Sequence, residues 1–196
     1  MTWDLPITVR IDGKDYAIRN GFDYRIALDT IAALTDDSMT AGARAFCALT
    51  IFYEDLGDAD KEQAMRELLK LLNLGEDQQQ GDEAKPKLMD WQHDFLLIAP
   101  AVSRVLGYDV RDQHRTTHWF TFIGAYMEIG ECAFATVVRI REKTRKGEKL
   151  EKWEHEFLRE NQKLVKLPTK LTAEEEDLLR QLVGDKEWQA QTAASR

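Results

Sequence analysis

The stretch HRTTHWFTFIGAYMEIG, residues 114–130, decides how the chain can fold, because it places four aromatic rings and two of the four histidines within seventeen positions. Trp119, Phe122, Ile123 and Tyr126 recur at steps of three and four, which is the spacing of one face of an α-helix. A helix with so large an apolar face needs a packed interior to cover it. The stretch therefore predicts a structural helix that buries these four side chains.

The same stretch contains a second pattern, because His114 and His118 are four residues apart and could face one ion from a helix. A zinc site needs three or four ligands. A carboxylate such as Asp109 or Asp112 could complete one, but the chain has no H-E-x-x-H motif and no nearby cysteine pair. We favour the alternative, in which His118 is partly buried beside Trp119 and makes one hydrogen bond. We expect no metal and no cofactor.

The N-terminal stretch ITVRIDGKDYAI, residues 7–18, predicts a β-hairpin. Its Asp12-Gly13 pair lies between two alternating runs and suits a type I′ turn, in which both central residues take positive φ. That turn sets the register, so one face of the hairpin is apolar and must pack on the rest of the fold. The predicted opposing pairs are Ile11 with Lys14, Val9 with Tyr16, and Ile7 with Ile18.

The rest of the chain has helical periodicity, so the predicted fold is mainly α: a compact helical domain with the N-terminal hairpin packed on it. Residues 1–170 are expected to form this single domain. The polar segment EDQQQGDEAKPK, residues 76–87, has no periodicity and predicts an exposed loop. Residues 171–196 contain a T-x-x-E capping box and predict a short C-terminal helix followed by a frayed tail.

Side chains that can cap helices, and glycines that can end them, divide the helical part. A helix over residues 22–34 is followed by candidate N-caps at residues 36–38 for a second helix. A third is expected to begin at Asp58, and a fourth to run from Asp90 to Gly107. The second helix is predicted to turn one apolar stripe toward the core, formed by Phe46, Leu49, Tyr53 and Leu56.

The overall charge balance, 27 Lys and Arg against 35 Asp and Glu, gives a net charge of -8. This argues against a general affinity for nucleic-acid phosphates. Charges interrupt the apolar runs well before the roughly 20 residues that a membrane span needs, and the N-terminus lacks a signal-peptide core. The chain is expected to be soluble and not exported. Cys47 and Cys132 lie outside any ligand motif, so both are expected to be reduced.

Charge is unevenly distributed, because residues 139–170 hold 11 basic and 6 acidic side chains whereas residues 1–138 have a net charge of -10. A basic helical segment can meet nucleic acid, an acidic surface or another helix. The alternative is a solvated face on which Glu and Lys side chains pair, and we favour it because the six acids dilute any attraction to phosphate. An apolar stripe runs through this segment, formed by Leu150, Trp153, Phe157 and Leu164.

Sequence motifs for catalysis are absent. The chain has no G-x-S-x-G elbow and no glycine-rich phosphate-binding loop. Its carboxylates are abundant, but their number does not identify a general acid and a general base, which would be a pair with separated pKa values. We expect that the protein is not an enzyme and has no catalytic residues.

Several segments follow one another in a characteristic order. LPITVRIDGKDYAIRNGFDYRIAL (5–28) combines a proline-led strand, an Asp-Gly turn, a second strand and a helix start, and DWQHDFLLIAPAVSRVLGYDV (90–110) is an Asp-aromatic helix that ends in a Gly-Tyr turn. Further on come His118-Trp119 with Phe122, then Phe134, Val137, Val138 and Arg141, then the Lys-x-Leu end in LVKL (164–167). In this order they resemble the bacteriophage gene-product-fifteen family, whose signature is a His-Trp-Trp run with a phenylalanine shortly after it. Phe120 stands where the second tryptophan would be.

The resemblance implies a function. It implies a non-catalytic tail assembly chaperone that works in the host cytoplasm, keeps the long helical tape measure protein soluble and recruits tail tube subunits around it. A helical chaperone can cover such a client by helix-in-groove packing, and a homo-oligomer is compatible with this role. His118, Trp119, Phe122 and Arg141 are then motif residues with a structural role.

The predicted partner contacts are large apolar side chains on otherwise charged segments, which tend to be interface anchors. They are Trp153, Phe157, Leu164 and Trp188. The alternative is that this stripe folds back on the core. Two rival functions stay open, a nucleic-acid-binding or packaging-linked accessory protein that uses residues 139–170, and a small metal-dependent enzyme built around His114 and His118.

Overall fold

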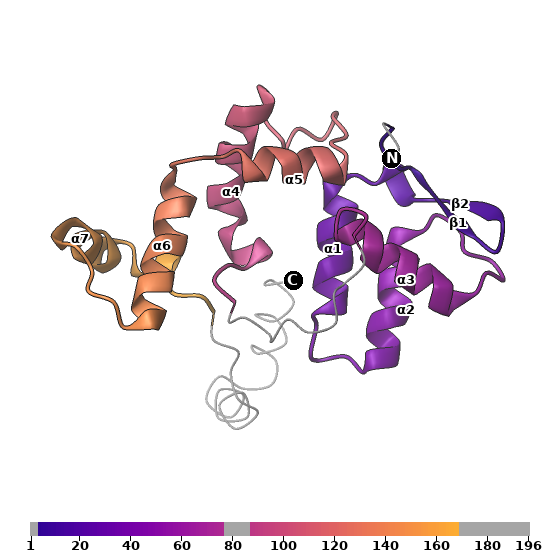
Figure 1. Ribbon diagram of the computed structural model, residues 1–196, viewed down its shortest axis with the longest axis horizontal. Helices are drawn as coiled ribbons and strands as arrows, with labels where there is room; N and C mark the ends of the chain where they lie inside the picture. The colour runs from indigo at the N-terminus through magenta and orange to yellow at the C-terminus, as the bar shows by residue number, and fades with distance from the viewer. Residues whose placement is uncertain (1–3, 77–86, 169–196) are drawn as a thin grey trace, which may run out of the picture.

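The structure, a computed structural model, describes residues 4–76 and 87–168, and this part is mainly helical with a β-hairpin near its N-terminal end (Figure 1). The predicted fold class is therefore confirmed. The predicted helix and tail over residues 171–196, which include Trp188, lie outside the described residues, as does most of the predicted loop at 76–87. The division of the chain at residue 170 stays a prediction.

The described residues form two strands, a 3-10 turn and eight helices. The strands are β1 (Thr8–Ile11) and β2 (Lys14–Ala17), and a single 3-10 turn covers Arg19–Gly21. The helices are α1 (Tyr24–Leu34), α2 (Ala41–Phe52), α3 (Lys61–Leu72), α4 (Trp91–Leu106), α5 (Trp119–Met127), α6 (Ala133–Lys146), α7 (Lys152–Glu160) and α8 (Gln162–Val165).

The hairpin has the predicted turn and register. Asp12 and Gly13 have φ values of 47° and 80°, the pair of positive angles that a type I′ turn requires. Val9 and Ile11 are buried, and β1 packs against α3. Ile7 was predicted on the same apolar face but is 57% exposed, because it lies past the last ladder pair at the open end of the hairpin.

Caps explain where the helices begin, and two predicted caps are wrong. The side chain of Thr40 accepts the Ala43 backbone N–H and begins α2, so none of residues 36–38 is its N-cap. The carboxylate of Asp60 accepts two backbone N–H groups and begins α3, so Asp58 is not its cap. The bounds of α4 are as predicted, with a cap at Asp90 and a left-handed end at Gly107.

The helix α2 ends at Phe52, so the last two residues of the predicted stripe, Tyr53 and Leu56, lie beyond it, and a third residue of the stripe faces solvent. Leu49 and Tyr53 are buried, but Phe46 is 66% exposed. The buried face of the helix is centred between Ala48 and Phe52. Six residues at 3.6 per turn place Phe46 about 120° around the axis from Phe52, which turns its ring to solvent.

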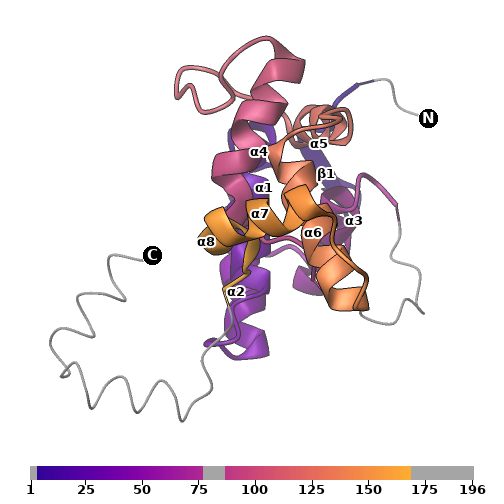
Figure 2. The same ribbon diagram turned by 90° about the vertical axis from the view of Figure 1, so that its left-hand side faces the viewer.

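Two hydrophobic clusters lie side by side along the molecule. The larger contains the hairpin, α1 to α5 and the first turn of α6, and the smaller is formed by Val137, Ile140, Leu150 and Val165. In Figure 1 the hairpin, α2 and α3 occupy one end of the long axis and α7 the other. Figure 2 looks from the α7 end, with α7 nearest the viewer, and α8 packs against α6. The described chain is therefore elongated, with different helices at its two ends.

The centre of the larger cluster is aromatic, and α5 supplies it as predicted. Trp119 is 3% exposed, and Phe122 and Ile123 are buried with it. The Trp119 ring packs on Phe122 with centroids 5.9 Å apart, and its indole N–H donates to the carbonyl of Leu72 (3.1 Å). Tyr126 is half-buried against the Trp91 ring. Residues 114–130 thus contribute a large part of the aromatic core.

Replacing Trp119 with alanine should lower the free energy of unfolding by about 3–5 kcal/mol, because it opens a cavity and leaves the Leu72 carbonyl without its donor. Chemical denaturation followed by circular dichroism measures the change. Trp153, which is 48% exposed, offers the matched control, and Trp153→Ala should cost far less. Equal losses at the two positions would show that Trp119 is not the core residue described.

Candidate functional site

Residues 22–24 and 117–119 hold each other at the starts of two helices. The backbone N–H of Trp119 donates to the Phe22 carbonyl, and the backbone N–H of Tyr24 donates to the Thr117 carbonyl, both at 2.8 Å. The buried carboxylate of Asp23 accepts the Thr117 N–H with one oxygen (2.8 Å) and caps α1 with the other. This short antiparallel bridge joins segments that are far apart in the sequence.

His118 is a capping residue at the same bridge. Its Nδ1 accepts the Phe120 N–H at the start of α5 (3.1 Å), so its Nε2 carries the proton and donates to the Pro6 carbonyl (3.0 Å). The ring packs edge-on against Phe22, with centroids 5.2 Å apart. Both ring nitrogens are therefore committed to the backbone. This adds helix capping to the predicted role of a partly buried, hydrogen-bonded histidine.

His114 does not share the environment of His118. It is exposed, and its backbone N–H donates to the Asp112 carboxylate (2.9 Å). Across residues 4–76 and 87–168, no group of three or more His, Cys, Asp or Glu side chains is placed to hold a metal ion. The two histidines thus have separate structural surroundings.

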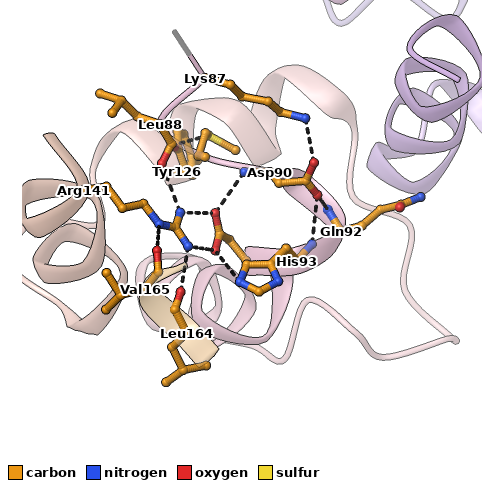
Figure 3. Close-up of polar contacts among 11 residues, drawn as sticks. Lys87, Leu88, Asp90, Gln92, His93, Tyr126, Arg141, Leu164 and Val165 are labelled. Atoms are coloured by element: carbon orange, nitrogen blue, oxygen red, sulfur yellow. Dashed lines mark hydrogen bonds and ion pairs between the residues drawn. The ribbon is translucent and has the colours of Figure 1, made fainter. Parts of the chain in front are cut away.

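Arg141, the last of the motif residues, is the centre of a buried network (Figure 3). Its guanidinium forms a two-pronged pair with the Asp94 carboxylate, at 2.7 and 2.8 Å. Its remaining N–H groups donate to the carbonyls of Leu88, Leu164 and Val165 at 2.7 to 3.0 Å. All five donors of the side chain are satisfied, so the charge is buried without loss of hydrogen bonds.

The Asp94 side of the network reaches the start of α4. Asp94 also accepts the backbone N–H of Asp90 (2.9 Å), and Asp90 in turn caps the helix and pairs with Lys87 (2.6 Å). Burial works against ionisation of Asp90, but hydrogen bonds from Lys87 and from the backbone N–H groups of His93 and Gln92 outweigh it and lower the pKa of the carboxyl. The network therefore ties α4, α6 and α8 into one unit.

The predicted contact stripe is divided by the structure. One helix was expected over it, but the chain breaks at Asn161 into α7 and α8. Trp153 is 48% exposed with the Arg139 guanidinium over its ring (5.2 Å), and Leu164 is 36% exposed. Phe157 is half-buried against the smaller cluster. Two of the three described candidates thus remain on the surface, and Phe157 supports the core.

The basic segment, residues 139–170, forms several ion pairs. Glu154 is buried at the centre of one group, where it accepts Lys143 with both oxygens (2.8 Å) and lies 3.6 Å from Arg139. The pKa of the Glu154 carboxyl is lowered by the hydrogen bond from Lys143 and by the hydrogen bond from the Glu151 backbone N–H. The charges of Lys143 and Arg139 lower it further, whereas desolvation acts in the opposite direction. Further pairs join Lys146 to Glu142 and Arg159 to Glu156. These pairs favour the solvated-face interpretation of the segment.

A groove between α2 and α3 was not predicted. It has a volume of about 670 Å³ and is lined by residues that include Phe46, Leu49 and Met65. Helical periodicity identified Phe46 as apolar but assigned it to the core, since spacing alone does not say which side of a helix meets solvent. The four acids of the following segment EDLGDAD, residues 54–60, are the sequence signal that marks this region as surface.

The geometry defines a mainly helical protein whose motif residues cap helices and fill buried networks. The chain belongs to the family of the Bacteriophage Gp15 protein, whose family model matches residues 1–167. Membership confirms the family that the sequence motifs resemble and points to a phage structural or morphogenetic protein. No curated protein and no solved structure matches the chain. Within the described ranges, every helix is too short or too polar to cross a bilayer.

Replacing Arg141 with methionine should lower the free energy of unfolding by about 3–5 kcal/mol, because the Asp94 charge is left buried without a partner. Denaturant titration measures the loss. Adding Asp94→Leu to the same chain should restore much of it, since no lone charge then remains. The exposed pair Arg111–Asp109, at 2.9 Å, is the control, and Arg111→Met should leave the melting temperature unchanged. Equal effects of the two single changes would contradict the buried network.

The lowered pKa of Glu154 predicts how stability depends on pH. Its ionised form stabilises the fold fully above the ordinary glutamate pKa of 4.5, and the contribution is lost as pH falls through the lower folded value. The melting-temperature advantage of the wild type over Glu154→Gln should therefore be constant near neutral pH and shrink in acid. Glu156→Gln, an exposed change on the same helix, should keep the wild-type pH dependence. An advantage that grows in acid would contradict the lowered pKa of Glu154 in the folded protein.

Proposed function

We propose that the chain is a non-catalytic tail assembly chaperone, which binds the tape measure protein and tail tube subunits in the host cytoplasm. The observation that carries the proposal is membership of the Bacteriophage Gp15 family over residues 1–167. His118, Trp119, Phe122 and Arg141 all serve the fold, so binding has to come from other side chains.

The surface offers such side chains. Large apolar residues stay exposed on several elements, at Leu5, Ile7, Phe46, Leu74, Leu96, Val105, Met127, Trp153 and Leu164. Isolated exposed apolar residues are ordinary, so only those beside a groove or a cluster argue for binding. Contacts of modest strength at several places suit a chaperone that must hold an elongated client and later release it.

A second candidate function is a nucleic-acid-binding or packaging-linked accessory protein that uses residues 139–170. Its support is the net charge of +5 in that segment, 11 basic against 6 acidic residues. The ion pairs of Arg139, Lys143 and Lys146 offset part of this charge. Binding of this kind would fall steeply with salt in a gel-shift titration. A shift that is absent, or insensitive to salt, removes the candidate.

Co-expression with the tape measure protein of the same phage tests the chaperone proposal. The tape measure protein should be insoluble when expressed alone, because apolar helical stripes have no cover, and soluble when this chain is present. The two should co-purify through an affinity tag on either partner. A tape measure protein that stays insoluble, with none recovered beside this chain, refutes the proposal.

A further inference from the structure

The groove between α2 and α3 combines the volume of a binding cleft with an exposed aromatic ring. Its volume of about 670 Å³ lies within the range of binding clefts, roughly 300–1,000 Å³. Apolar lining comes from both helices and from the turn between them, and includes Leu49, Leu56 and Met65 as well as the exposed Phe46 ring. At 66% exposure, Phe46 is open to a partner to a greater degree than Trp153, which Arg139 partly covers.

The groove walls are fixed without any partner. Arg19 donates to the carbonyls of Thr50, Ile51 and Tyr53 (2.8 to 3.0 Å) and so holds the end of α2 against the hairpin. The Tyr53 hydroxyl donates to the Ala64 carbonyl (2.9 Å) and fixes α2 against α3. A preformed groove does not have to be ordered on binding, which favours affinity.

The acidic charge of residues 54–60, beside the groove, favours partners that carry basic residues. The connection EDLGDAD, residues 54–60, has four acids and no base, and Glu54 and Asp55 line the groove. The other charged lining residues are Arg19, Lys61 and Glu62, so the lining holds three acids and two bases. An apolar partner with lysine or arginine at the end beside this connection complements the groove.

We propose that this groove is the docking site for an amphipathic helix of the client, with large apolar residues against Phe46, Leu49 and Met65 and basic residues beside 54–60. The inference rests on the proposed function in taking the client to be the long helical tape measure protein. A helix fits because two packed helices form the walls, as in other helix-in-groove complexes. The α7–α8 surface is the weaker candidate, since Phe157 is turned into the smaller cluster.

Phe46→Ser tests the site, with Leu96→Ser as the matched control. Leu96 is also a large apolar side chain on a helix and is 73% exposed, but it lies on α4 away from the groove lining. Capture of the tape measure protein should weaken roughly 30-fold for Phe46→Ser, the loss typical of an interface hot spot, and be unchanged for Leu96→Ser. Unchanged melting temperatures of both variants show that the fold is intact.

Each other outcome overturns the inference in a distinguishable way. If the wild type and Phe46→Ser capture the client equally, the groove is not the site but the chaperone proposal stands. If Trp153→Ser loses capture and Phe46→Ser does not, the site is at α7. If the purified wild type is dimeric by light scattering and Phe46→Ser is monomeric, the groove binds a second copy of this chain. If the wild type captures nothing, the function and the site fall together.

The charge requirement has its own test. Glu54→Gln with Asp58→Asn removes two charges while Asp55 and Asp60 keep their hydrogen bonds to backbone N–H groups. Overlapping tape measure peptides can be titrated against this variant and the wild type by fluorescence anisotropy. The wild type should prefer apolar peptides with basic ends and bind them more weakly at high salt, and the variant should show a smaller salt dependence. Equal salt dependence in both would exclude the charge match.

Discussion

The bridge between residues 22–24 and 117–119 is the constraint on which the rest of the fold depends. It places the N-caps of α1 and α5, Asp23 and His118, opposite each other, so the start of each helix is held against the start of the other. Phe22 adopts a positive φ of 63° there, a conformation that costs a non-glycine residue about 1–3 kcal/mol. Full burial of its ring and the hydrogen bond from Trp119 offset that strain. The His-Trp part of the family signature lies at this junction for a physical reason.

The Arg141 network has a corresponding role in the second half of the chain. The smaller cluster has few apolar residues, so it offers little burial to hold α8 in place. Arg141 compensates by hydrogen bonding to the last carbonyls of α8 and to Asp94 on α4. Buried ion pairs add little net stability compared with apolar packing, but they specify one arrangement because a misplaced partner would leave a charge unpaired. The two halves are thus fixed by different physical means.

Local signals predicted local structure well. The Asp12-Gly13 turn sets the strand register by itself, and the period of the Trp119 to Tyr126 stretch identifies a core helix. Partners distant in sequence could not be predicted: nothing in the periodicity pairs Arg141 with Asp94, and Phe46 has the same spacing as its buried neighbours although it faces solvent. His118 was recognised as a hydrogen-bonded ring, but its role as a helix cap depends on where the helix begins.

The hydrogen bonds that hold the α2–α3 groove together allow its lining to change in evolution without loss of the fold. Its walls are positioned by two side chains that donate hydrogen bonds to backbone carbonyls. Arg19 donates to carbonyls at the end of α2, and Tyr53 donates to the carbonyl of Ala64 in α3. Every residue type has such a carbonyl. The lining residues other than Arg19 and Tyr53 can therefore be exchanged one at a time while the walls keep their spacing. Mutations that alter the chemistry of the lining are then largely uncoupled from mutations that threaten folding. Related phages could diverge in what this surface accepts while retaining the same scaffold.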